Sequence, residues 1–288
     1  MHTYKPSKTV KEQVEYLESN KRVVFNEISK KEAEEILFKY GYINVITPYK
    51  HRFAKKDKGK VVKDETGRHI YERDVDFKEY YDLYVNERKK YPTISANVIY
   101  FETRFRSILS YAILNSTDIN CDSDLMNFLE SIRLRISQSN NYSEKRLEHM
   151  NESISKLENN IEKYHDVYCF FDNLSLGESL TLFNGLDYKT QDKIFDSCKS
   201  INIHFNVDKT PDFASKVFTL VSVRNCVMHC NSLEVLKRFF NPKYKTLRDR
   251  KSTRTFESMI NYLSNEKAHT EWCELSSDLG SIYDSILH

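Results

Sequence analysis

The sequence predicts an all-α fold, and three observations support this prediction. The chain of 288 residues contains only 6 glycines and 5 prolines, fewer than a protein with many tight turns and strand corners needs. Apolar residues recur at intervals of three and four over several long segments, the period of a helix that buries one face. Capping residues mark the starts of some of these segments. We therefore expect long helices joined by short connections.

Composition and charge narrow the class of protein further. Hydrophobic residues make up 40% of the chain and charged residues 30%, which is typical of a globular protein. The formal net charge of +2 is too balanced to reveal a polyanionic partner, so a nucleic-acid function must show as a local basic patch. No apolar run is long enough to cross a membrane, and the N-terminus lacks the apolar stretch of a signal peptide. We expect a cytoplasmic protein without a membrane partner.

The spacing of the cysteines and the absence of common site motifs argue against several kinds of site. None of the 6 cysteines forms a C-x-x-C pair, so we expect reduced thiols and not a disulfide framework. The chain lacks G-x-x-x-x-G-K-[ST], G-x-G-x-x-G, H-E-x-x-H and G-x-S-x-G. We therefore expect no cofactor, and neither nucleotide-binding nor hydrolase templates gain support.

Two helices are predicted at the N-terminal end. Residues 7–21 carry apolar residues on one face, and residues 29–40 have the same period. Ser29 is a candidate N-cap with Glu32 three positions later, and Gly41 suits the end of the second helix.

The next apolar run, over 41–53, is either an extended segment or a buried turn, and a basic segment overlaps its end. Residues 50–63 read KHRFAKKDKGKVVK, with seven Lys or Arg and a single Asp. This segment is either a solvated loop or an exposed arm whose cations neutralise phosphates. The candidate RNA-binding residues are Lys50, Arg52, Lys55, Lys56, Lys58 and Lys60 in this segment, with Arg104 and Arg106 further along the chain.

An aromatic stripe and a proline mark the next part of the chain. Residues 74–91 have helical periodicity, and their aromatic stripe is more typical of a core than of a base-stacking surface. Pro92 interrupts the pattern, so we place a boundary there between a helical region over 1–91 and a helical domain over 92–288. The aromatic residues of the stripe are Phe77, Tyr80, Tyr81 and Tyr84.

Two further helices follow from their periodicity. Residues 95–115 read as one long amphipathic helix. Residues 147–164 show apolar spacings of three and four in alternation, which form a heptad seam. The seam is too short for a free coiled coil, so it predicts a helix packed against a neighbour or placed at a dimer contact.

The last strong helix carries the residues best suited to chemistry. It begins at Thr210, continues to about residue 240, and contains Arg224, Asn225 and His229. On an ideal helix Asn225 and His229 share a face, whereas Arg224 and His229 lie about 140° and about 7.5 Å apart. One helix therefore offers only part of a site. A second copy across a two-fold axis would complete it, which predicts a homodimer.

A histidine and an arginine at one site suit RNA cleavage. A histidine that titrates near neutrality can take the proton from a ribose 2′-hydroxyl and return one to the leaving 5′-oxygen. An arginine can hold the scissile phosphate and offset the charge that grows in the transition state. The attacking group belongs to the substrate, so the reaction requires no metal, and DNA cannot react in this way.

Two other interpretations of this segment remain open. In the first, the arginine and the histidine are structural and are satisfied by neighbouring carboxylates. In the second, Cys226, His229 and Cys230 share a helical face and bind zinc, with a fourth ligand from His204 or Cys198. Structural zinc sites usually draw paired ligands from turns, so cysteines that pack the core are the simpler expectation.

Three segments of the chain together carry a family resemblance. They read NEISKKEAEEILFKYGYINVITPYKHRFA, HIYERDVDFKEYYDLY and RNCVMHCNSLEVLKRF. In this order they resemble the Abi family, in particular its AbiF/AbiD-like abortive-infection proteins of bacteria. The resemblance extends over most of the chain, from about residue 21 to about residue 240.

The resemblance implies a HEPN-like helical bundle with an N-terminal helical extension and a basic loop. The HEPN hallmark is an arginine, usually a polar residue, and a histidine further on, which Arg224, Asn225 and His229 match. It implies a homodimeric, metal-independent endoribonuclease that acts as a toxin in antiviral defence and is restrained by a small non-coding RNA bound at the basic segment. Glu102 and Arg106 would be further polar groups of the cleft.

The sequence also supports two functions other than a nuclease. The basic segments over 50–63 and 243–255 favour an RNA-binding module without catalytic activity. The heptad seam over 147–164 favours a dimeric scaffold.

Overall fold

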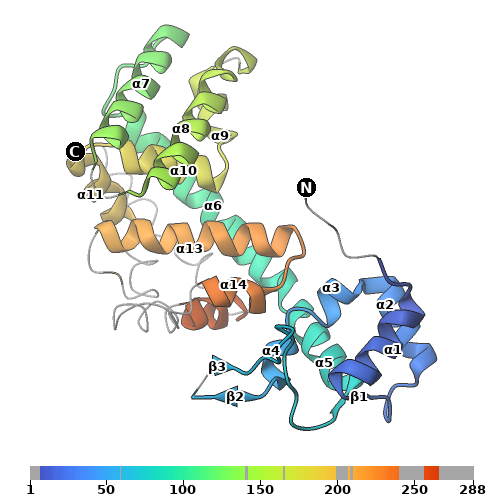
Figure 1. Cartoon of the computed structure of the whole chain (residues 1–288). Coiled ribbons are helices and arrows are strands. Elements are labelled where there is room, and N and C mark those ends of the chain that lie inside the picture. The colour runs from blue at the N-terminus through green and yellow to red at the C-terminus, as the bar shows by residue number, and fades with distance from the viewer. Residues whose placement is uncertain are drawn as a thin grey trace. The chain divides into compact units, whose positions relative to one another are not determined.

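The computed structural model of the protein is all-α, as predicted (Figure 1). The residues that the structure describes are 7–58, 60–139, 142–164, 166–198, 207, 210–239 and 256–265. The chain divides into two compact units. The first unit comprises Met1–Pro92 and Cys226–Thr246, and the second comprises Thr93–Asn225 and Leu247–His288.

The first unit begins with two capped helices, both as predicted. α1 spans Val10–Lys21 and α2 spans Lys30–Tyr40. The side chains of Thr9 and Ser29 each accept a hydrogen bond from an amide in the first turn. In return, a glutamate of that turn accepts a bond from the backbone amide of the capping residue. These reciprocal bonds fix where each helix starts.

A short pair of parallel strands and one helix complete the core of the first unit. β1 (Val23–Val24) pairs with β4 (Val75–Asp76), and α5 spans Phe77–Arg88. Phe77 and Tyr80 of α5 are fully buried, and the other two aromatic residues of the predicted stripe pack partly buried against them. The stripe therefore belongs to the core, as the sequence favoured.

The segment between α2 and β4 differs from the loop that the sequence suggested. Its apolar part forms two short helices, α3 (Tyr42–Val45) and α4 (Lys50–Phe53), with buried residues between them. The apolar run is therefore a buried turn and not an extended segment. The centre of the basic segment forms an antiparallel hairpin of β2 (Lys56–Asp57) and β3 (Lys60–Val61), with Lys58 at a φ of 46°. The predicted basic loop is thus partly helix and partly hairpin.

The long helix α6 spans Tyr91–Leu114 and begins earlier than predicted. The helical pattern is interrupted at 89–90, between the end of α5 and the start of α6, and Pro92 is the second residue of α6. A proline is tolerated there since the amides of a first turn have no acceptor within the helix. Phe101 and Phe105 of α6 are fully buried, with ring centroids 5.6 Å apart.

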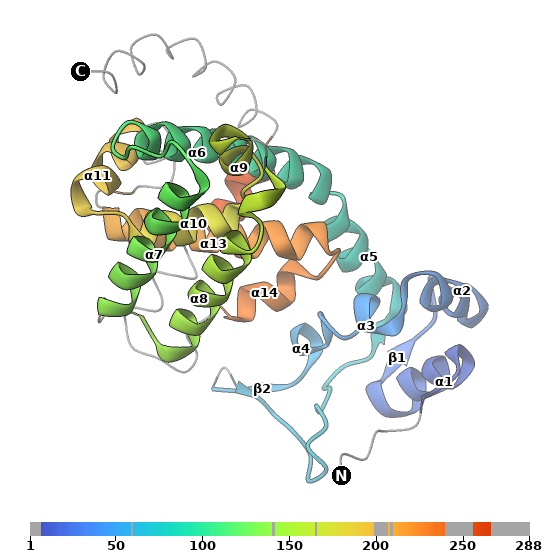
Figure 2. The ribbon, with the colours of Figure 1, turned by 90° about the horizontal axis from the view of Figure 1, so that it is seen from above.

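The second unit packs three helices closely around the heptad seam. α7 spans Asp122–Gln138, α8 spans Glu144–Glu158 and α10 spans Leu176–Gly185. α10 packs on both α7 and α8, which also pack on each other (Figure 2). The seam lies on α8 and continues into the 3₁₀ helix η1 (Ile161–Lys163), where it is buried within this unit. The seam therefore packs against neighbouring helices of the same chain, which is the first of its two predicted uses.

The remaining helices are α9 (Val167–Asp172), α11 (Tyr188–Ser197), α13 (Thr210–Met228), α14 (Leu233–Phe239) and a helical segment over 256–263. α13 is shorter than predicted, because a turn separates it from α14. Over the residues that can be described, no helix combines the length and the apolar character that crossing a membrane requires.

Gly185 allows α10 to approach α7 closely. A Cβ atom at this position would lie 2.4 Å from Cγ2 of Ile132 and 3.0 Å from its carbonyl oxygen. We predict that Gly185→Ala lowers the free energy of unfolding by about 1–3 kcal/mol, because the backbone of α7 must shift. Gly177→Ala in the same helix is the control, since its nearest neighbour lies at 3.9 Å. Urea titrations that give both variants equal stability would contradict the close packing.

Candidate active site

Arg224 lies on α13 in the second unit and is oriented by a buried carboxylate. Its Nε donates to Oε2 of Glu102 over 3.4 Å. The other oxygen, Oε1, accepts the backbone amide of Leu176 at the start of α10 over 3.0 Å. Glu102 is only 8% exposed, so both bonds form where water competes little. The sequence indicated Glu102 only through the family resemblance, because its partners lie far away in the chain.

The Arg224 guanidinium has one further described hydrogen bond and is partly exposed. Nη1 donates to Oδ1 of Asn225 over 3.4 Å, and Asn225 is exposed. The side chain of Arg224 itself is one third exposed. A guanidinium has five N–H donors in a rigid plane, so donors are left over for an anion. One carboxylate neighbour, which the structural interpretation expected, is nevertheless present.

His229 follows directly after α13, in a turn that belongs to the first unit. The amide of Cys230 donates to the carbonyl of Val227 over 3.0 Å, and that of Asn231 to the carbonyl of Cys226 over 2.8 Å. With Cys230 at a φ of 51°, this is a Schellman motif that ends the helix. The ideal-helix angle between the motif residues therefore does not apply. This end could not be predicted from the sequence, because a cysteine stands where glycine is usual.

Polar groups of α5 and the start of α6 hold this turn in place. The hydroxyl of Tyr91 and Nη1 of Arg88 both donate to the carbonyl of Asn231. The carboxylate of Glu87 accepts three bonds at the start of α14, from two backbone amides and from the hydroxyl of Ser232. A carboxylate at this end of a helix satisfies amides that otherwise lack partners.

The His229 side chain is exposed and, among the described residues, makes no hydrogen bond or ion pair. No described residue therefore occupies its ring nitrogens. Cys226, by contrast, is buried, and burial raises the pKa of its thiol to about 12. Within the described ranges no three His, Cys, Asp or Glu residues are grouped as a metal site. His204, considered as a zinc ligand, lies outside those ranges.

All but one of the predicted RNA-binding residues fall into two groups. The second basic stretch, over 243–255, lies outside the described residues. The first group is held by partners within the protein: Arg52 pairs with Glu234, Lys55 lies 3.1 Å from Glu72, and Arg106 donates to the carbonyl of Leu174. Lys50 belongs to this group because it too has an interaction. Arg104 belongs to neither group, since its Nε is buried without a described hydrogen-bond partner. The second group, Lys56, Lys58 and Lys60, is exposed on the hairpin.

Glu234 binds basic side chains of α4, one of which also contacts α14. Nε2 of His51 donates to it over 3.0 Å, and Arg52 donates to its other oxygen. Arg238 bonds to Nδ1 of the same imidazole. Burial would raise the pKa of Glu234, but the hydrogen bonds from His51 and Arg52 outweigh burial and lower it from 4.5 to about 2.

This shift predicts a stability change in acid. The pKa of the folded state lies below that of the unfolded state, so the stabilisation is complete above about pH 5 and is lost as the pH falls toward 2. We expect Glu234→Gln to unfold more easily than the wild type at pH 7, by on the order of 2 kcal/mol, and the difference to shrink toward pH 2. Urea titrations across this range measure it. Glu35→Gln, at an exposed position of α2, serves as the control. A difference in the free energy of unfolding between wild type and Glu234→Gln that does not change with pH would refute the low pKa of Glu234.

The comparison with known proteins agrees with the resemblance seen in the sequence. The family model of Abi-like proteins matches residues 35–233, which is more than half of the chain and includes Glu102, Arg224 and His229. No curated protein and no solved structure matches the chain. The chain therefore belongs to the family of Abi-like proteins.

Proposed function

We propose that this protein is a metal-independent endoribonuclease that uses Arg224, Asn225 and His229. The observation that carries the proposal is the contrast between Arg224 and His229. Arg224 is oriented by Glu102 yet keeps donors for an anion, and His229 is exposed with no described partner. Phosphate binding requires an oriented cation with free donors, and proton transfer requires an accessible imidazole.

In the proposed reaction His229 removes the proton from a ribose 2′-hydroxyl. The 2′-oxygen attacks the adjacent phosphorus, the bond to the 5′-oxygen breaks, and an imidazolium returns a proton to the leaving oxygen. Arg224 binds the non-bridging phosphate oxygens and stabilises their added charge. The products carry a 2′,3′-cyclic phosphate and a 5′-hydroxyl.

A second copy of the chain would supply the other acid or base. α13 has an exposed side that includes Phe218, 43% exposed, Asn225 and Met228, 38% exposed. Exposed apolar side chains on the helix that bears the motif favour burial against a partner. A two-fold axis along this side would bring two Asn225 residues together. We therefore include a homodimer in the proposal.

Membership of the Abi-like family suggests abortive-infection defence. In that setting we propose a toxin-like nuclease acting during viral infection. We further propose that a small non-coding RNA bound at the hairpin lysines Lys56, Lys58 and Lys60 restrains it.

Substitution of His229 tests the nuclease directly. We expect wild-type protein to cleave single-stranded RNA in EDTA and to leave 2′,3′-cyclic phosphate ends. His229→Ala should lower the rate by about 10²–10⁴-fold, because the proton-transfer group is removed. The control is His149→Ala on α8, where the histidine is exposed and lies beside Glu152. A His229→Ala protein that cleaves as fast as the control would refute the assignment.

The exposed hairpin also supports a second candidate, an RNA-binding module without catalysis. We expect the triple variant Lys56→Ala, Lys58→Ala, Lys60→Ala to bind single-stranded RNA less tightly. The slope of log affinity against log salt should fall by about 2, since each lost phosphate contact removes about 0.7. A triple alanine variant at Lys11, Lys31 and Lys39, which are exposed on α1 and α2, is the control. Equal losses in the two variants would exclude a specific role for the hairpin.

A further inference from the structure

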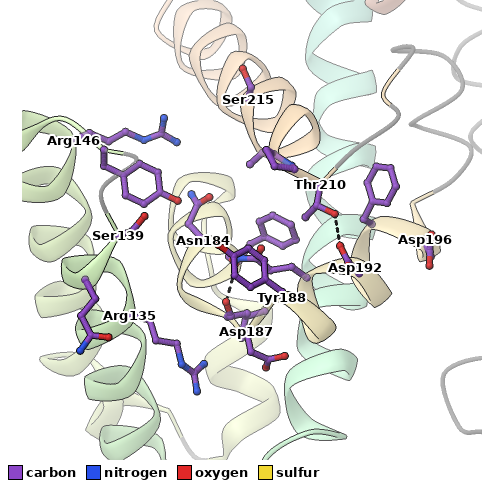
Figure 3. A pocket seen from close by; sticks show the side chains of 18 residues that line it. Arg135, Ser139, Arg146, Asn184, Asp187, Tyr188, Asp192, Asp196, Thr210 and Ser215 are labelled. Atoms are coloured by element: carbon purple, nitrogen blue, oxygen red, sulfur yellow. Dashed lines mark hydrogen bonds between the residues drawn. The ribbon is translucent and has the colours of Figure 1, made fainter.

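A cavity of about 1300 Å³ lies in the second unit, and none of the motif residues lines it (Figure 3). Its walls come from α7, α8, α10, α11 and the first turns of α13. Figure 3 shows Arg135 and Arg146 on one side and Asp192 and Asp196 on the opposite side, with Tyr188 between them. The cavity therefore offers cations on one side, two carboxylates on the other, and an aromatic ring and a third carboxylate, Asp187, between them.

Arg146 is the strongest sign of an anionic ligand. Its guanidinium carbon lies 4.9 Å from the ring centroid of Tyr142 and 5.0 Å from that of Phe218. Stacking on rings orients the guanidinium but uses none of its N–H donors. The described residues provide no hydrogen-bond acceptor and no carboxylate for it, although it is only partly exposed. An oriented cation with free donors is suited to bidentate binding of a phosphate.

Two of the carboxylates that line the cavity already accept hydrogen bonds from within the protein. Asp187 caps α11 and accepts both the amide and the hydroxyl of Thr190. Asp192 accepts the hydroxyl of Thr210 over 2.5 Å. Asp196 makes no such bond within the described residues, so its oxygens are open to a ligand with N–H groups.

Asn184 and Tyr188 supply the groups that a base would need. Tyr188 is 78% exposed at the start of α11, so one face of its ring is open to stacking. Asn184 is half-buried on α10, and its amide has no described partner. Amide and carboxylate groups are those that pair with base edges, and aromatic rings hold bases by stacking.

We propose that this cavity binds a nucleotide, with its phosphate at Arg146 and its base against Tyr188 and Asn184. An acidic peptide would match the arginines but would be repelled by the carboxylates opposite them, whereas a nucleotide places N–H groups there. The nucleotide is either free or one unit of an RNA chain, and in the second case the inference rests on the proposed function. Ser215 of α13 lines the cavity, and Arg224, nine residues further along (215 to 224), lies about 14 Å away on the same helix.

Calorimetric titration of the full-length His229→Ala protein tests this site without cleavage of the ligand. The ligands are the four ribonucleoside 5′-monophosphates in one arm and short single-stranded oligoribonucleotides in the other. We expect saturable binding, weakened about tenfold or more by Arg146→Ala and by Tyr188→Ala, through loss of a charge-assisted bond and of stacking. Lys145→Ala is the control, because this lysine is the exposed neighbour of Arg146 on α8 and does not line the cavity.

Saturation by a monophosphate indicates a free nucleotide as the ligand, and binding of oligonucleotides alone indicates RNA; both support the site. Absence of binding in both arms overturns it, as does an equal effect of Lys145→Ala and Arg146→Ala. Equally tight binding of an acidic hexapeptide also overturns it. Nucleotide binding in this titration, together with a wild-type protein that fails to cleave RNA, would refute the nuclease while leaving the cavity assignment intact.

Discussion

The buried carboxylate of Glu102 is the interaction on which both the second unit and the candidate site depend. One of its oxygens receives the first amide of α10, and the other receives Nε of Arg224. A carboxylate with so little exposure is tolerated only with such partners. The same group therefore fixes where α10 begins and the direction in which Arg224 extends. The structural interpretation of Arg224 and the catalytic one do not exclude each other, because the salt bridge leaves part of the guanidinium unused.

Glu87 plays the corresponding role in the first unit. Its carboxylate collects two amides and a hydroxyl at the start of α14, while Tyr91 and Arg88 hold the carbonyl of Asn231. These bonds fix the turn that carries His229 but leave the imidazole itself without a described partner. In both units a carboxylate placed by a long helix positions a motif residue by acting on its surroundings. Such positioning keeps the reactive groups free.

The sequence predicted best those features that depend on neighbours in the chain. The capping box of Ser29 and the packing of the heptad seam follow from spacings of three and four. The interruption predicted at Pro92 lies slightly earlier, at 89–90, because the first turn of a helix tolerates a proline. The end of α13 escaped prediction because Cys230 holds a left-handed conformation that glycine usually signals. The contact between Glu102 and Arg224 spans 122 residues, and only the family resemblance pointed toward it.

Counting basic residues in the sequence overestimates the number of cations free to bind phosphate. Arg52 is committed to Glu234, and breaking this pair to reach RNA would expose a largely buried carboxylate. Lys55 is held more weakly, since its ion pair with Glu72 is exposed to solvent. Arg146 was not in the predicted set, yet it stacks on two rings and has no described carboxylate. Affinity for a polyanion therefore depends less on how many cations a segment contains than on which of them the fold leaves without a counter-charge.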